Sequence, residues 1–158
     1  MSNEYKDWLR DQVEEPRETI KKYPLLQIKC NDVAPYLEEG GHEVTWLDEL
    51  PTGWQYIGYR MCEELSDALG DYADNWVIIQ LKEKFGRICL YWNWDYYEDF
   101  TDEQAAEMNK LYDVIEDILD KYADISWNTC AVCGSPATEH SSGWVLPYCK
   151  ECYDRKFT

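Results

Sequence analysis

Two Cys-x-x-Cys pairs near the C-terminus constrain this chain more than any other feature. Cys130 and Cys133 form the first pair, and Cys149 and Cys152 form the second. Fifteen residues separate the pairs, a spacing that is typical of zinc ribbons. Each pair is expected to make a tight turn that directs two sulfur atoms at one point, and Gly134 can adopt the positive φ that such a turn needs. We therefore expect one structural Zn²⁺, held by four thiolates that leave no position open for water.

Disulfides or a redox-active Cys-x-x-Cys are the alternative chemistry for these cysteines. The chain has seven cysteines, an odd number, and Met1 is followed by polar residues and not by the apolar stretch of a secretory signal. Both observations favour a reducing cytosol, so we expect metal ligation and a cytoplasmic protein. Cys30, Cys62 and Cys89 are then ordinary buried thiols, and His140 is expected to be an exposed loop residue.

Acidic residues are concentrated before the cysteine pairs. The chain has 32 Asp and Glu against 15 Lys and Arg, a net charge of −17, and from Ser126 onward the acids and bases balance. We therefore divide the chain into an acidic α+β domain, 1–125, and a zinc-ribbon module, 126–158. A negative field repels nucleic acids and anionic membranes and attracts basic partners, so we expect no direct nucleic acid binding and no membrane. The same charge also keeps an aromatic-rich protein soluble, which is the simpler explanation.

The hydrophobic pattern predicts two helices with clear boundaries. The first begins at a Thr52–Gln55 capping box and ends at Gly70. The second begins at a Thr101–Gln104 capping box and runs to about Tyr122. Apolar residues at helical spacing are expected to face the core: Trp54, Ile57, Met61, Leu65 and Leu69 in the first, and Met108, Leu111, Tyr112, Ile115, Ile118, Leu119 and Tyr122 in the second.

β-Branched and aromatic runs at 76–81 and 88–94 predict two antiparallel strands, joined through 82–87. A further helix is expected at 3–14, whereas the prolines and glycines of 16–51 permit no assignment. The predicted fold class is α+β, a small antiparallel hairpin packed by amphipathic helices, with a C-terminal zinc ribbon. In the second strand one face is expected to carry Ile88, Leu90, Trp92 and Trp94, and the other Cys89, Tyr91 and Asn93.

The second predicted helix also carries a stripe of carboxylates. Such a row can meet a basic protein, or it can imitate the phosphates of DNA and occupy a DNA-binding cleft. A solvated helix face is the plainer alternative. The stripe consists of Asp113, Glu116, Asp117, Asp120 and Asp124, of which Asp113, Asp117 and Asp120 are the candidate partner-binding residues.

Aromatic residues of the predicted hairpin lie beside basic ones. Stacking rings with nearby cations are what a nucleotide ligand needs, although core packing is the better explanation for Trp92 and Trp94. The candidate binding residues here are Lys84, Phe85, Arg87, Tyr91, Tyr96 and Tyr97.

Enzyme signatures are absent from the sequence, which contains no GxxxxGK[ST], GxGxxG, HExxH or GxSxG. A zinc deaminase needs Pro-Cys-x-x-Cys, and Tyr148 separates Pro147 from Cys149. The chain has two His, which makes imidazole-based acid–base chemistry hard to build. We expect a protein that is not an enzyme.

From Trp54 onward the chain resembles a widespread group of small proteins from bacteriophages, prophages and bacteria. The residues that carry the resemblance are 61–65, the Lys-Glu-Lys-Phe-Gly segment 82–86, the segment 129–134 and Gly143-Trp144-Val145. Relatives carry a second glycine where this chain has Arg87. The resemblance implies a phage or mobile-element context and no particular activity.

These features together lead to one functional hypothesis and three alternatives. We expect a non-enzymatic, zinc-containing binding protein, encoded by a phage or prophage, that binds and blocks a basic component of the host cell's antiviral defence. One alternative is a sponge that sequesters a nucleotide-type signal through the hairpin aromatics with Lys84 and Arg87. The others are an acidic DNA mimic and a housekeeping adaptor.

Overall fold

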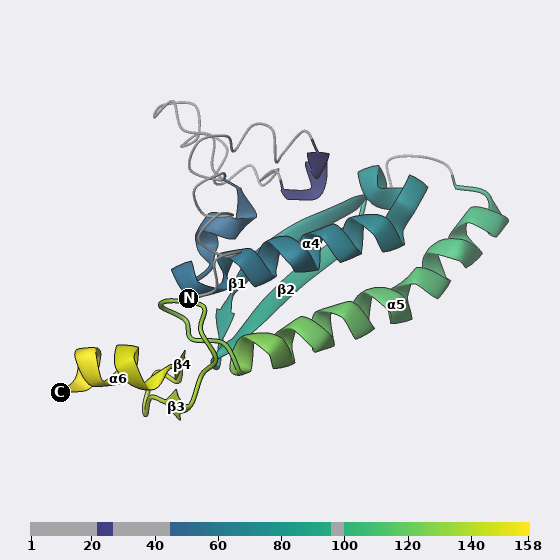
Figure 1. Cartoon of the computed structure of the whole chain (residues 1–158). Helices are drawn as coiled ribbons and strands as arrows, with labels where there is room; N and C mark the ends of the chain where they lie inside the picture. Colours follow the sequence, from purple (N-terminus) through teal and green to yellow (C-terminus); the bar gives the residue numbers. More distant parts are fainter. Residues whose placement is uncertain (1–21, 27–44, 96–99) are drawn as a thin grey trace.

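The computed structural model describes residues 22–26, 45–95 and 100–158 (Figure 1). The helix predicted at 3–14 lies outside these residues. Within them the chain is an α+β protein, in which an antiparallel hairpin and its packed helices are followed by a cluster of four cysteines. None of the described helices is long and apolar enough to cross a membrane.

Helix α4 spans Gln55–Leu69 and ends at Gly70, whose φ of 52° is the positive value that only glycine adopts freely. The capping box predicted at Thr52 is wrong. Thr52–Trp54 form a short 3-10 helix, η3, and the α-helix begins after Trp54, which has no capping side chain. A backbone bond to the C-terminal region replaces the cap, because the Gly53 N–H donates to the Ala131 carbonyl at 2.9 Å.

The hairpin consists of β1, Trp76–Lys84, and β2, Arg87–Trp94, paired so that Lys84 lies opposite Arg87. The link predicted to span 82–87 is therefore wrong, since only Phe85 and Gly86 lie between the strands. Their φ values of 52° and 78° are both positive, as a type I′ turn requires. The sequence hides this turn because Phe is rare at a positive φ, where Asn is the usual residue.

Alternation along β2 is confirmed. Ile88, Leu90 and Trp94 are buried and Trp92 is half-buried, whereas Tyr91 is exposed. In β1 the register shifts between Ile78 and Gln80, and the extra residue leaves Ile79 exposed.

Helix α5 spans Asp102–Trp127, and its predicted capping box between Thr101 and Gln104 is confirmed. The helix passes the predicted end near Tyr122 because no glycine or proline interrupts the next turn. Ser126 is fully buried there, and its hydroxyl accepts the Ile88 N–H of β2 at 2.8 Å. The apolar residues of this helix that were predicted to face the core are buried or half-buried, with one exception. Tyr112 is 53% exposed.

One apolar cluster joins α4, α5 and both strands, and α5 contacts both α4 and β2 (Figure 1). Short 3-10 helices add to it: η1 at Pro24–Leu26, η2 at Trp46–Glu49 and η4 at Gly70–Asn75. Thr45 begins η2 with a capping box that the sequence analysis did not assign. We call the described residues from 45 to 127 the helix–hairpin body.

The four-cysteine module, residues 128–158, lies beyond the C-terminal end of α5 (Figure 1). It contains β3, Glu139–His140, paired with β4, Pro147–Tyr148, and then helix α6, Lys150–Phe157. Trp54 ties the body to it, since its buried indole N–H donates to the Thr129 carbonyl at 2.9 Å.

Candidate functional site

The first cysteine pair forms the tight turn that the sequence predicts. The Gly134 N–H donates to the Cys130 carbonyl at 3.0 Å, and the Cys130 N–H donates to the Ser135 carbonyl at 2.7 Å. Gly134 has the predicted positive φ, 75°. This geometry turns the side chains of Cys130 and Cys133 toward the same side of the loop.

The second cysteine pair has a different local structure from the first. Cys149 is the N-cap of α6, and its Sγ accepts the N–H of Cys152 at 3.4 Å. The two sulfurs therefore come from the first turn of a helix, and the tight turn expected for this pair is replaced by helix α6. Burial raises the pKa of the Cys149 thiol, and the hydrogen bond from the Cys152 N–H offsets only part of this effect.

All four Sγ atoms lie within 4.8 Å of one another, and those of Cys133 and Cys149 are 3.7 Å apart. Sulfurs bonded to one Zn²⁺ at about 2.3 Å stand about 3.8 Å apart at the corners of a tetrahedron. A disulfide would need a separation of about 2.05 Å, and all four thiols are free. The cluster thus has the ligand set and spacing of a metal site.

The thiols of the cluster differ in how readily they lose a proton, because burial raises the pKa of Cys149 and of Cys152, whereas the pKa of Cys133 is lowered. Burial raises the pKa of Cys133, but hydrogen bonds with Ser135, Cys130 and Cys149 outweigh it and lower the pKa to about 7. This thiol therefore loses its proton readily near neutral pH, as a metal ligand must. Cys62 is different, because full burial raises its pKa and keeps it an inert core thiol, as predicted. Cys89 is only half-buried.

His140 takes no part in the cluster. It is exposed, as predicted, but it belongs to β3 and not to a loop. Its ring stacks on Trp127 with centroids 4.0 Å apart, and a ring nitrogen lies 3.1 Å from the Trp127 carbonyl. His140 therefore joins the module to the end of α5.

The hairpin turn and the module place two large aromatic rings in solvent. Phe85 is 78% exposed and Trp144 is 77% exposed. Glu83 lies between them: one carboxylate oxygen accepts the Trp144 indole N–H at 3.0 Å and the other accepts the Gly86 N–H at 2.9 Å. The two rings line a pocket of about 400 Å³ with Lys84 and Val145 among its walls. We call Phe85, Trp144 and Val145 the aromatic tip.

Phe85 is a predicted binding residue, whereas Trp144, its neighbour in the structure, is not. The Gly143-Trp144-Val145 motif carries part of the resemblance to phage and bacterial proteins, which implies no role for Trp144. An apolar ring next to a glycine between two metal-binding pairs was the signal available, since such loops protrude.

The two basic candidate residues of the hairpin, Lys84 and Arg87, contact different neighbours. Lys84 Nζ donates to the Tyr91 hydroxyl at 3.0 Å, so these two candidates are together. Arg87 pairs instead with Asp124 of α5 and lies over the Trp127 ring, 5.0 Å from its centroid. The other two candidates, Tyr96 and Tyr97, lie outside the described residues.

Asp113, Asp117 and Asp120 are all exposed on α5, and we call them the acidic face. Within the described residues none of the three forms an ion pair. Asp124, from the same predicted stripe, is neutralised by Arg87. The acidic face therefore leaves its charge available to a partner.

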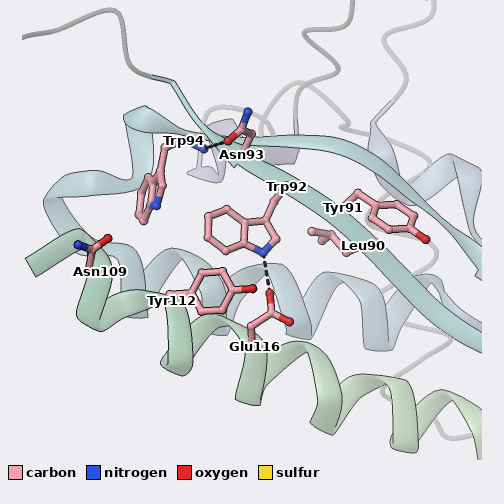
Figure 2. Close-up of a pocket in the computed structure, with 8 residues that line it drawn as sticks. All are labelled: Leu90, Tyr91, Trp92, Asn93, Trp94, Asn109, Tyr112 and Glu116. Carbon is pink, nitrogen blue, oxygen red and sulfur yellow. Dashed lines mark hydrogen bonds between the residues drawn. The ribbon is translucent and has the colours of Figure 1, made fainter. Parts of the chain in front are cut away.

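A second pocket, of about 600 Å³, opens between β2 and α5 (Figure 2). Trp92 is at its centre, with its indole N–H donating to Glu116 Oε1 at 3.0 Å. The rings of Trp94 and Tyr112 stand beside Trp92, with centroids 5.5 and 5.6 Å from it. The sequence pattern predicts core positions for Trp92, Trp94 and Tyr112 and a place in the carboxylate stripe for Glu116, and no local pattern brings these four residues together.

No known protein family matches this chain, and no curated protein or solved structure is significantly similar to it.

Proposed function

We propose that the chain is a non-enzymatic binding protein in which one structural Zn²⁺ holds the four-cysteine module. Four thiolates complete a tetrahedral Zn²⁺ and leave no coordination position for a substrate or a reactive water. The metal then fixes the loop that carries Trp144, so its role is to shape a surface. Of the common metal ions, Zn²⁺ suits a closed four-sulfur tetrahedral site best, with iron as the competitor.

The partner in this proposal is a protein with a basic surface. The observation that carries the binding function is Phe85, a bulky residue held at a φ of 52° with 78% of its surface exposed. Such a conformation costs on the order of 1–3 kcal/mol, and residues kept in it concentrate at functional sites. Phe85 and Trp144 together offer the kind of aromatic anchors that contribute most to protein interfaces.

The negative charge of the chain determines which kind of partner protein it attracts. The chain carries −17 overall, and the acidic face adds three carboxylates without an ion pair among the described residues. Complementary charge speeds association and excludes acidic proteins. With the phage and prophage resemblance of the sequence, this favours a cytoplasmic protein of the bacterial host, such as a component of antiviral defence, that is bound and blocked.

Sequestration of a nucleotide remains the second hypothesis, and the contacts of Arg87 weigh against it. Phosphate binding needs an uncommitted cation, whereas Arg87 already pairs with Asp124. Lys84 is the remaining cation of the turn, and it donates to Tyr91.

The test is salt-dependent capture of a host protein. Tagged protein is incubated with bacterial lysate, the captured partner is purified, and its association rate is measured at about 0.05 and 0.3 M salt. We expect the rate to fall steeply with salt and to fall about tenfold when Asp113, Asp117 and Asp120 are changed to Asn.

The matched control removes three exposed carboxylates from the end of α4 and from η4, with Asp67→Asn, Asp71→Asn and Asp74→Asn, none of which forms an ion pair within the described residues. Net charge changes equally in both variants, so only a local role of the acidic face separates them. Equal slowing in both, or no slowing in either, would show that the acidic face does not recognise the partner.

A further inference from the structure

Three adjoining aromatic rings and one carboxylate lie together in the pocket between β2 and α5, whose lining also includes Leu90, Tyr91, Asn93 and Asn109 (Figure 2). The ring planes of Trp92 and Trp94 are 86° apart, and those of Trp92 and Tyr112 are 48° apart. The rings thus present π-surfaces in several directions around one space. Tyr112, at 53% exposure, forms the open wall of this space. We call Trp92, Trp94, Tyr112 and Glu116 the aromatic pocket.

The position of Tyr112 argues against an ordinary core role. Tyr112 continues the apolar stripe of α5 in the sequence, yet its neighbours Met108 and Ile115 are buried while it is not. It packs against Trp92 and leaves a pocket of about 600 Å³, within the ~300–1,000 Å³ range of small-molecule sites.

Glu116 gives the pocket a negative charge that has no counterion in the described residues. The Trp92 indole N–H occupies one carboxylate oxygen, and no Lys or Arg there pairs with the other. Helix α5 as a whole contains eight acidic residues against two basic ones. Neither of these two, Lys110 and Lys121, lines the pocket.

A cation is the ligand that these features recognise together. The faces of Trp and Tyr rings attract positive charge through their π-electrons, and a carboxylate at the rim supplies a charged hydrogen-bond acceptor. An anionic or phosphorylated ligand would meet Glu116 and the negative field of α5. An uncharged apolar ligand would leave that carboxylate desolvated without a partner.

We propose that the aromatic pocket takes an arginine side chain from the basic surface of the partner protein. Arginine fits better than lysine because its planar guanidinium is weakly hydrated, stacks on aromatic faces and still donates hydrogen bonds in its plane. The guanidinium lies on the open side of these rings, which already contact one another at centroid distances of 5.5 and 5.6 Å, and it donates to the open oxygen of Glu116. The inference rests on the proposed recognition of a basic protein and adds the residue that such a protein inserts.

The acidic face extends this site along the same helix. Asp113 and Asp117 each follow a pocket residue of α5 by one position and are exposed. Basic residues that flank the inserted arginine would meet these carboxylates, while the arginine alone enters the pocket. The negative charge of the acidic face and the aromatic pocket therefore make separate contributions to binding.

Two peptides of equal charge separate those contributions. One is an acetylated, amidated pentalysine, and the other is the same peptide with arginine at its centre. Calorimetric titration of the zinc-loaded protein at low salt should give about three- to tenfold tighter binding of the arginine peptide. Tyr112→Ala changes no charge, and it should remove this preference while pentalysine binding stays within about twofold.

Glu116→Gln tests the carboxylate without removing the acceptor of the Trp92 indole, because the amide oxygen can take its place. This variant should weaken the arginine peptide more than the lysine peptide. Val114→Ala is the matched control, since Val114 is exposed on the same helix and does not line the pocket. It should leave both affinities and the preference unchanged.

The outcomes distinguish this inference from the proposed function. Equal binding of the two peptides, or a preference that survives Tyr112→Ala, would overturn the arginine pocket and leave recognition of basic proteins standing. Failure of both peptides to bind at low salt would overturn recognition of a basic surface and the pocket with it. Melting temperatures of all variants should match the unaltered protein within a few degrees, so that lost binding is not lost folding.

Discussion

The helix–hairpin body and the four-cysteine module are held together by different forces. In the body, α4, α5 and the hairpin bury a continuous set of large side chains, with Trp54, Leu65 and Ile115 fully enclosed. The buried cluster of the module contains Cys130, Tyr148 and Cys152, two of which are candidate metal ligands. Even with the half-buried Leu146 and Tyr153 packed on it, so small a cluster offsets little of the entropy of ordering about thirty residues, and we expect a metal bound by the four cysteines to supply the difference.

The same contrast separates the surfaces of the two regions. The acidic face and the aromatic pocket belong to the body, whereas the module carries a balanced charge and the exposed Trp144. The aromatic tip needs both regions, because Phe85 comes from the hairpin and Trp144 from the module. Metal binding should therefore control the tip and leave the acidic face unaffected.

Metal removal is the largest perturbation that we expect. Structural Zn²⁺ contributes on the order of 10–16 kcal/mol in small four-ligand modules. Cys130→Ser should release about one Zn²⁺ per chain and unfold residues 128–158, while the body keeps its helices. Elemental analysis gives the metal content, and amide hydrogen exchange reports each region separately.

Cys89→Ser is the control for that experiment, because Cys89 is half-buried in β2 and lies outside the cluster. It should retain the metal and full protection of the module. A metal-free protein whose module stays protected would show that apolar packing suffices there, and the contrast between the two regions would fail.

The junction between the regions should give a smaller effect. A Cβ at Gly53 would lie 2.1 Å from the Cys130 carbonyl oxygen, an overlap that backbone atoms must relieve. Gly53→Ala should cost about 1–3 kcal/mol of unfolding free energy and loosen the module, seen as faster hydrogen exchange at Cys130 and Ala131.

Gly58→Ala provides the comparison, since its Cβ would meet the Leu50 and Leu47 side chains, which can move. It should disturb the body alone and leave exchange in the module unchanged. If both variants loosen the module equally, the two regions form one cooperative unit and the junction has no special role.

Sequence alone predicted the clustering of the module's four cysteines and much of the body, for different physical reasons. Cysteine spacing is a local signal, and the positive φ of Gly134 follows from it. Hydrophobic periodicity predicted the buried faces of α4, α5 and β2, because each element buries one side. Both signals work without knowledge of the tertiary fold.

Tertiary contacts decided what the sequence missed. Thr52 has the right spacing for a capping box, yet Gly53 is bound to Ala131, far along the chain. Tyr112 fits the apolar stripe of α5, yet Trp92 and Trp94 leave it partly outside the core. The nearness of Phe85 to Trp144 depends on how the module sits beside the hairpin, which no local pattern encodes.

The hairpin turn should give the smallest effect on stability and the clearest conflict between stability and function. Asn is the preferred residue at the first central position of a type I′ turn, because it tolerates the positive φ that strains Phe85. Phe85→Asn should therefore raise the free energy of unfolding by about 1 kcal/mol, or the melting temperature by about 2–4 °C. It should also weaken binding of the captured host protein by about tenfold or more, since it removes an aromatic anchor.

Val132→Asn is the matched change for this prediction, because Val132 is an exposed apolar residue of the module that lies outside the tip. It should change the melting temperature by no more than a degree or two, and it should change partner binding by no more than about twofold. If the Phe85→Asn protein is more stable and binds as before, Phe85 does not contact the partner. Recognition would then depend on the acidic face and the aromatic pocket alone. A destabilised variant would mean that Phe85 contributes contacts in the folded protein that outweigh its backbone strain, which would remove the main argument for a functional tip. Thermal melts and binding titrations of the same preparations decide among these outcomes.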